Sequence, residues 1–377
     1  MKVPFNRPYM TGNELSNIAE AHANGHLSGD GAFTKKCHAW LEANTHANRA
    51  LLTHSCTAAL EMAALLTDLK PGDEVIMPSF TFVSTANAFV LRGAVPIFVD
   101  IRADTLNLDE RLIEAAITPR TKAICVVHYA GVSCDMDAIG DIARKHGLYV
   151  IEDAAQGICS TYKNQPLGTI GDLGALSFHE TKNIISGEGG ALLVRDPEFG
   201  ERAEIIREKG TNRSRFFRGQ VDKYTWVDQG SSFLPGEITA AFLSAQLDQA
   251  EAITERRLAL WQRYYEWAQE YESRGLIRRP IVPSDCKHNA HMFYMLLPDL
   301  QKRTRFIQLL REHDVQAVFH YIPLHSAPHG LKTGRAHGDL TVTDRVSDTL
   351  VRMPLWVGLD SQLDRVFSVA GEALEKL

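Results

Sequence analysis

Short apolar segments rich in Val, Ile and Ala recur along the first two thirds of the chain, separated by stretches with helical spacing. The segments cover residues 74–77, 95–99, 123–127, 149–151, 175–178 and 191–194. Two of the intervening stretches, 109–117 and 136–146, place apolar residues at helical intervals, and Gly147 follows the second where helices commonly end. Strands that are apolar along their whole length are buried on both faces, so the pattern predicts a mainly parallel sheet covered by helices.

The pattern changes near residue 245. A long, charged, amphipathic stretch at 247–271 is followed by strand candidates at 291–297 and 316–322. Helix candidates lie at 304–313 and from about residue 362. A chain of 377 residues has room for about two domains. We therefore expect a large α/β domain over residues 1–245 and a small α+β domain over residues 246–377.

The composition argues against some classes of binding partner. The chain has 40 Lys and Arg against 46 Asp and Glu, a net charge of −6, which argues against a nucleic-acid partner or an anionic membrane surface. The uncharged segment 75–91 contains Pro78 and many polar side chains, so it is not expected to span a membrane. The first ten residues lack the apolar core of a secretory signal, and the six cysteines form no C-x-x-C pair. We expect a cytoplasmic protein with reduced cysteines.

Polar residues that directly follow the apolar segments are the candidates for chemistry, because ligands of such sheets lie beyond the carboxyl ends of the strands. The first group, residues 53–60, leads small hydroxyl side chains into a helical pattern at 58–66. The free N–H groups and positive dipole end of such a helix suit a phosphate. An ordinary helix N-cap explains the same residues, so this group alone leaves both interpretations open.

Two further groups contain an acid and a lysine. Asp153 leaves the end of a strand segment, where a carboxylate can hold a protonated ring nitrogen or a cation, or simply cap a helix. Lys182 follows Ser177 and His179 and precedes a glycine-rich turn. A lysine whose pKa is lowered by its surroundings forms Schiff bases with carbonyl compounds, although an isolated lysine is usually a surface residue. A phosphate cradle, a carboxylate and such a lysine are together what pyridoxal phosphate requires of a protein.

Four segments carry a specific resemblance to a known family. Residues 78–87, 152–156, 177–182 and 187–190 resemble the DegT family of sugar aminotransferases, and the resemblance covers nearly the whole chain. It implies an aspartate-aminotransferase-like fold of type I and a pyridoxal 5'-phosphate cofactor that passes through pyridoxamine phosphate. It also implies a homodimer in which a second copy of the chain completes each active site.

The resemblance also implies roles for individual residues. Lys182 would form the Schiff base with the cofactor, Asp153 would bond the ring nitrogen, and Gln156 would lie close to the ring. The remaining cofactor-binding residues implied by the family are Phe82, stacked on the ring, and Ser55, Cys56, Thr57, Ser177 and Ser232, at the phosphate. Ser232 would act from the neighbouring subunit, where many family members have a Tyr-Asn pair in place of Ser231 and Ser232.

Within the family, segments 207–226 and 318–325 are most similar to transaminases that form dTDP-4-amino-4,6-dideoxygalactose for enterobacterial common antigen. The resemblance implies L-glutamate as donor and the C4 keto carbon of dTDP-4-keto-6-deoxyglucose as acceptor. A basic, aromatic stretch at 202–223 suits the nucleotide diphosphate, although a solvated surface loop would have the same composition. The residues that we expect to contact the substrate are His179, Arg213, His320 and His325.

Three other interpretations are weighed against this one. A 3-aminotransferase acting on a dTDP-3-keto-6-deoxy sugar fits the same motifs, because regiochemistry depends on how the sugar lies. The family's sugar 3-dehydratases replace the lysine with histidine, and Lys182 argues against that branch. A non-catalytic regulatory relative is disfavoured because Lys182, Asp153, Gln156 and Ser177 are all retained. The histidines late in the chain lack the spacing of metal ligands, so the sequence predicts no metal site.

Overall fold

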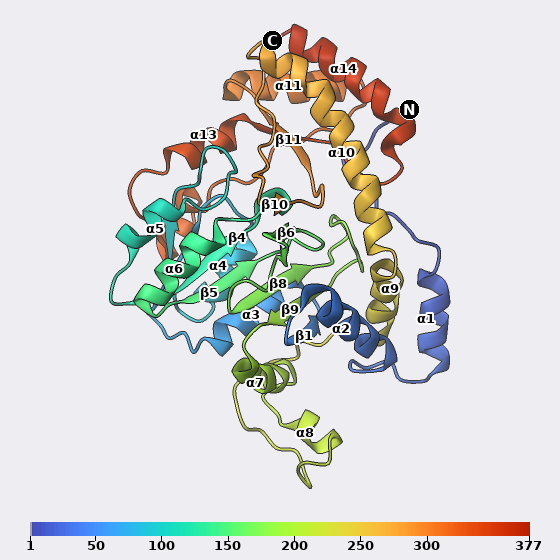
Figure 1. Ribbon diagram of the computed structural model, residues 1–377, viewed down its shortest axis with the longest axis vertical. Helices are drawn as coiled ribbons and strands as arrows, with labels where there is room; N and C mark the ends of the chain where they lie inside the picture. The colour runs from blue at the N-terminus through green and yellow to red at the C-terminus, as the bar shows by residue number, and fades with distance from the viewer. Residues whose placement is uncertain (1) are drawn as a thin grey trace.

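The computed structural model describes residues 2–377 and centres on an eight-stranded sheet (Figure 1). Its strands are β1 (Arg49–Thr53), β2 (Glu74–Pro78), β3 (Val95–Val99), β4 (Thr121–Val127), β5 (Tyr149–Asp153), β8 (Leu173–Ser177), β9 (Gly190–Val194) and β12 (Arg335–Ala336). Their order across the sheet is β1-β9-β8-β5-β4-β2-β3-β12. The strands from β8 to β12 in this order run parallel, and β9 runs against its neighbours β1 and β8. All six predicted strand segments and the predicted fold class are confirmed.

Helices cover both faces of this sheet, as the apolar strands predict. Successive residues of each strand enter different hydrophobic clusters: Leu51 and Cys125 lie in one, Leu52 and Ile124 in the other. The cluster with Leu52 contains residues of α1 (Glu14–Ala23), α2 (Ala32–Thr45), α5 (Glu110–Ala116), α6 (Met136–His146) and α9 (Glu237–Leu247). The cluster with Leu51 contains residues of α3 (Cys56–Leu66), α4 (Val83–Val90) and α7 (Pro197–Arg207). Across residues 2–377, no helix combines the length and apolar character that crossing a membrane requires.

A long helix, α10 (Ala250–Ser273), leads from this core into a third hydrophobic cluster. Ala250 and Ile253 pack in the cluster of the sheet, whereas Leu260 and Tyr264 pack in the third. The third cluster also contains residues of the antiparallel pair β11 (Phe293–Leu296) and β13 (Leu350–Met353) and of helices α11 (Leu300–Glu312) and α14 (Leu363–Glu375), which lie together at the top of Figure 1. The boundary between domains near residue 245 stays a prediction.

The remaining elements are short. They are the three-stranded sheet of β6 (Thr161–Tyr162), β7 (Gln165–Pro166) and β10 (Cys286–Lys287), the helices α8 (Arg213–Phe217), α12 (Gly330–Thr333) and α13 (Thr341–Thr349), and the 3-10 turns η1 (Tyr129–Gly131), η2 (Leu324–Ser326) and η3 (Leu359–Gln362).

One predicted strand is wrong. Residues 316–322 form no strand; Val318 makes only an isolated bridge with Arg352. The strand that pairs with β11 is β13 instead, from much later in the chain. Phe319, His320 and Tyr321 line a cavity, so their aromatic side chains leave the strand-like alternation that the sequence suggests.

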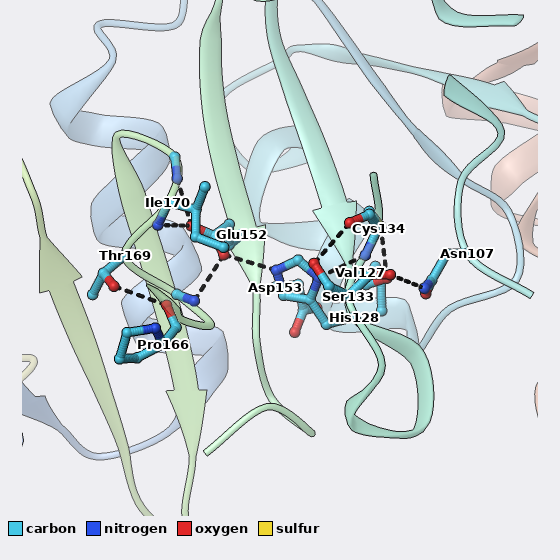
Figure 2. A network of polar contacts seen from close by, with 12 residues as sticks. Asn107, Val127, His128, Ser133, Cys134, Glu152, Asp153, Pro166, Thr169 and Ile170 are labelled. Carbon is cyan, nitrogen blue, oxygen red and sulfur yellow. Dashed lines mark hydrogen bonds and ion pairs between the residues drawn. The ribbon is translucent and has the colours of Figure 1, made fainter. Parts of the chain in front are cut away.

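A buried hydrogen bond between a histidine and a carboxylate joins the carboxyl ends of two central strands (Figure 2). Glu152, in β5, accepts a hydrogen bond of 2.7 Å from Nε2 of His128, the residue that follows β4; both side chains are fully buried. The Glu152 carboxylate also accepts the backbone N–H groups of Gly168, Ile170 and Gly171 at 2.6–2.7 Å. Nδ1 of His128 accepts from the N–H of Cys134 at 3.2 Å. One carboxylate therefore fixes β4, β5 and the turn that leads into β8.

We expect Glu152→Gln to lower the free energy of unfolding by about 3–5 kcal/mol, because an amide nitrogen would face backbone N–H groups and leave them unpaired. The midpoint of urea unfolding, followed by circular dichroism, measures the loss. Glu255→Gln on the exposed face of α10 is the matched control and should change stability by less than about 0.5 kcal/mol. Equal midpoints for the two variants would contradict the role given to Glu152.

Candidate active site

A cavity of about 600 Å³ opens where β4, β5 and β8 end. Val127, Asp153 and Ser177, the last residues of these strands, line it, together with residues 319–321 and Arg352 from the C-terminal part of the chain. The predicted site residues that the structure brings together here are Ser55, Cys56, Thr57, Phe82, Asp153, Gln156, Ser177, His179, Lys182 and His320. The site therefore lies where the topology of a parallel sheet predicts it.

The Asp153 carboxylate accepts hydrogen bonds from a hydroxyl group and a backbone N–H. Thr85 donates its hydroxyl to Oδ2 at 2.6 Å, and the N–H of Ala155 donates to Oδ1 at 3.1 Å. Thr81 lies 2.7 Å from the Thr85 hydroxyl and extends the chain of hydrogen bonds. A carboxylate can accept about four hydrogen bonds, so each oxygen keeps a lone pair for a donor in the cavity.

Lys182 lies in the turn after β8, where its backbone N–H donates to the carbonyl of His179 at 2.9 Å. Within residues 2–377, its ammonium makes neither a hydrogen bond nor an ion pair. Burial lowers the pKa of Lys182 below its ordinary 10.5; the nearby Cys56 and Asp153 raise this pKa, and Arg352 lowers it further. A larger share of uncharged amine makes the side chain a better nucleophile and base at neutral pH.

The start of α3 forms a second end of the cavity. Ser55 caps this helix by accepting the N–H of Ala58 at 3.1 Å, while Cys56 and Thr57 begin its first turn. N–H groups in a first helical turn have no acceptor within the helix and suit an anion. Gly190 makes this packing possible, because a Cβ there would lie 2.4 Å from the backbone nitrogen of Cys56.

The cavity has the groups that pyridoxal phosphate requires of a protein. The cavity offers an amine without a partner, a carboxylate with free lone pairs, and a helix start for the phosphate. Phe82 adds an aromatic side chain that is 58% exposed although it lines the cavity, so its ring is available to a planar group. The residues present fit this cofactor.

Gln156 connects the large sheet to the C-terminal part of the site. Its Oε1 accepts the N–H of Ala130 at 2.6 Å, and its Nε2 donates to the Tyr321 hydroxyl at 3.0 Å. His320 stacks on Tyr321 with ring centroids 3.6 Å apart, and its Nδ1 lies 2.7 Å from the Tyr129 hydroxyl. Burial lowers the pKa of His320 well below 6.5, so this ring is neutral at physiological pH.

Of four residues predicted to contact the substrate or the phosphate, His179 lines the cavity and the other three lie outside its lining. His179 lines the cavity but is 40% exposed and lies 3.7 Å from Glu188. His325 lies outside the lining, where its Nδ1 is 2.8 Å from the Ser79 hydroxyl. Arg213 and Ser232 are exposed on the segment around α8, which extends from the body of the protein in Figure 1. The substrate or phosphate roles of all four residues remain predictions.

Sequence analysis did not identify Thr85, which supports Asp153, or the cavity residues Tyr321 and Arg352. Thr85 lies inside the segment 78–87, about one helical turn after Phe82, and this position could have indicated a place beside the site. Tyr321 was assigned to a strand that does not form. Arg352 stands between Val351 and Met353, and a lone charge inside an apolar strand was the available signal for a functional residue.

Known proteins share this arrangement over their full length. The aminotransferase TlmJ from Streptoalloteichus hindustanus is 28% identical with a TM-score of 0.91, and all of both chains is covered. The putative sugar aminotransferase Spr1654 from Streptococcus pneumoniae, in its PMP form, is 26% identical with a TM-score of 0.92 over 99% of each chain; its PLP form is similar as well. The fold is therefore that of a fold-type I aminotransferase.

Sequence comparison gives the family. The spore coat polysaccharide biosynthesis protein SpsC from Bacillus subtilis is 34% identical over 386 aligned positions, which cover 99% of this chain and 97% of SpsC. Residues 8–370 match the model of the DegT/DnrJ/EryC1/StrS aminotransferase family, and the chain belongs to this family. The predictions of a transaminase and of pyridoxal phosphate as its cofactor are thereby confirmed.

A buried charge cluster lies where the segment around α8 joins the body. Arg207 pairs with Asp30 and donates to the carbonyl of Leu52 at 3.3 Å. Glu208 follows directly, and its backbone bridges to Ser232. Burial, reinforced by the neighbouring Asp30, raises the pKa of Glu208 to about 7.

This cluster makes the stability of the folded protein depend on pH. The folded-state pKa of Glu208, about 7, exceeds its ordinary 4.5, so the folded state binds this proton more tightly than the unfolded state does. The resulting stability is complete below pH 4.5 and is lost as the pH rises through about 7. Glu208→Gln should therefore flatten the fall in the urea midpoint over this range. Glu198→Gln, exposed on α7, should retain the parent slope, and a Glu208→Gln slope equal to it would refute the assignment.

Proposed function

We propose that the protein transfers the amino group of L-glutamate to the C4 keto carbon of dTDP-4-keto-6-deoxyglucose, which yields dTDP-4-amino-4,6-dideoxygalactose. The observation that carries the transfer of an amine is the Lys182 ammonium, without a partner among residues 2–377, in one cavity with the oriented Asp153 carboxylate. The similarity to SpsC and Spr1654 supports a sugar as acceptor. The choice of this sugar rests on the resemblance of segments 207–226 and 318–325.

The cofactor would be held at both ends of the cavity. Ser55, Cys56, Thr57 and Ser177 lie where they can bind its phosphate, and Asp153 can bond its ring nitrogen. When bound, pyridoxal phosphate supplies an electron sink for the carbanion that forms at the reacting carbon. The ionised Asp153 favours the protonated ring nitrogen through a charge-assisted hydrogen bond.

Lys182 moves the protons in this proposal. Once the donor amine has displaced it, its amine takes the proton from the α carbon of glutamate. In the second half of the reaction, the same amine returns a proton to C4 of the sugar. Its lowered pKa suits the first task because the uncharged amine is populated closer to neutral pH, and it suits the second because the ammonium then releases its proton more readily.

A homodimer in the cytoplasm is part of the same proposal. The segment that ends near Ser232 exposes Phe217 and Trp226, which are 68% and 77% accessible in the single chain. Large exposed apolar side chains on a projecting segment are typical of a contact surface between proteins. The Ser232 hydroxyl would then donate to the cofactor phosphate of the second subunit.

Borohydride reduction tests the role of Lys182. The purified holoenzyme should be yellow, should lose this colour on reduction, and should carry the reduced cofactor on Lys182, as located by peptide mass spectrometry. Lys182→Ala should retain no cofactor through reduction, whereas Lys163→Arg, at an exposed lysine paired with Asp137, should label as the parent does. A label on any other lysine would refute this role.

The product of the reaction tests the substrate. The enzyme is incubated with L-glutamate and a panel of dTDP- and UDP-linked keto sugars, and the position and orientation of the new amine are determined by NMR. The proposal expects the amine on C4 in the galacto configuration, with dTDP-4-keto-6-deoxyglucose as the best acceptor. Amination at C3, or preference for a UDP-sugar, would replace this substrate assignment.

A further inference from the structure

A histidine from the C-terminal part of the chain contacts the turn that carries Lys182. Nδ1 of His291 lies 3.1 Å from Oδ1 of Asn183, the residue that directly follows Lys182. His291 lines the catalytic cavity and lies two residues before β11, and the side chains of His291 and Asn183 are both buried. One buried hydrogen bond therefore joins the turn after β8 to the segment that leads into β11.

The neighbouring contacts fix which atom of this pair donates. Nδ2 of Asn183 donates to the carbonyl of Asn289 at 2.8 Å, so its Oδ1 is the atom that faces the imidazole. An amide oxygen only accepts hydrogen bonds, and the hydrogen must therefore lie on Nδ1 of His291. Burial lowers the pKa of His291 well below 6.5, so the ring is neutral and has this one N–H. Its Nε2 makes no hydrogen bond within residues 2–377.

The same network reaches the turn after β5. Nδ2 of Asn289, which is fully buried, donates to the carbonyls of Gln156 at 2.8 Å and Ile158 at 2.7 Å. Its Oδ1 accepts the backbone N–H of His291 at 3.0 Å. Two amides and one imidazole thus connect three segments: the turn that follows Asp153, the turn that carries Lys182, and the residues before β11.

The position of the Lys182 amine depends on the backbone of its turn, because the ammonium makes no hydrogen bond within residues 2–377. Proton transfer requires reacting atoms about 3–3.5 Å apart, and a displacement of about 1 Å can lower a rate by about 100-fold. The buried contact of Asn183 with His291 restrains this turn one residue away from the reacting side chain.

We propose that His291 is a positioning residue for Lys182, because its N–H bond to Asn183 fixes the turn from which the reacting amine extends. This inference rests on the proposed function, in which Lys182 is the reacting amine, but it does not depend on which keto sugar is the acceptor. Since the same amine acts with both substrates, loss of its position should slow both half-reactions alike.

Two replacements of His291 in the holoenzyme test this role. His291→Asn places an amide N–H where Nδ1 lies and can keep the bond to Asn183, whereas His291→Leu fills a similar volume without a donor. The rate and apparent affinity with L-glutamate come from the absorbance change between the two cofactor forms. His291→Leu should lower the rate about 10- to 100-fold with little change in apparent affinity, and His291→Asn should recover most of this loss.

A second measurement reports the position of the amine without turnover. Borohydride reduction followed by peptide mass spectrometry gives the share of bound cofactor that is linked to Lys182. His291→Leu should lose part of this label while it still binds the cofactor, and His291→Asn should keep the label of the parent. The midpoint of urea unfolding shows whether each variant is folded under the conditions of the assay.

His288→Asn is the matched control. Nδ1 of His288 accepts the N–H of Ala290 at 3.2 Å, and the oxygen of an asparagine can accept it from the same place. The ring of His288 packs against Trp261, with ring centroids 4.4 Å apart, and not against the turn of Lys182. His288→Asn should therefore retain the rate and the label of the parent.

A double variant tests whether His291 acts through Asn183. Asn183→Leu should lose rate and label as His291→Leu does. Because both substitutions remove the same connection, the double variant should be no slower than the slower single variant. Losses that add up in the double variant would contradict an action through Asn183.

The remaining outcomes separate this inference from the proposed function. Parent-like rate and label in His291→Leu would overturn the inference, and so would an equal loss in His291→Asn, because the role would then belong to Nε2. If the parent carries no label on Lys182, the proposed function fails and the inference fails with it. If the parent is labelled there but aminates no keto sugar of the panel, the proposed acceptor fails while the inference stands.

Discussion

The active site depends on the hydrogen bonds that the buried Glu152 carboxylate accepts. Successive residues of a strand face opposite sides of the sheet, so fixing Glu152 on one face directs Asp153 to the other. The same carboxylate holds the backbone at Gly168, Ile170 and Gly171, just before β8. The ends of β5 and β8 are therefore held in register, and with them Asp153 and Ser177.

Hydrogen bonds from neighbouring residues restrict the polar side chains of the cavity. Thr81 and Thr85 orient Asp153 from one side, and Gln156 connects the turn after β4 to Tyr321 of the C-terminal part. Restricting side chains in this way keeps reacting groups within the small distances that catalysis requires. Lys182 differs, since its ammonium makes no hydrogen bond within residues 2–377, which leaves it free to carry protons as proposed.

The sequence predicts the parts of the site that depend on local order along the chain. Asp153 and Lys182 each follow an apolar strand, and the topology of a parallel sheet then brings them to one edge. Arg352 and Tyr321 could not be found in this way, because their positions depend on the pairing of β13 with β11 and on the path of residues 316–322 across the cavity. Ser232 and Arg213 are exposed on the segment around α8 and do not line the cavity, so the order of residues along the chain does not bring them to the site.

The surroundings of Lys182 in the cavity favour its uncharged amine. Lys182 and Arg352 both line it, and burial together with the positive charge of Arg352 lowers the pKa of Lys182. Before the donor arrives, this favours the uncharged amine that reacts with a carbonyl group.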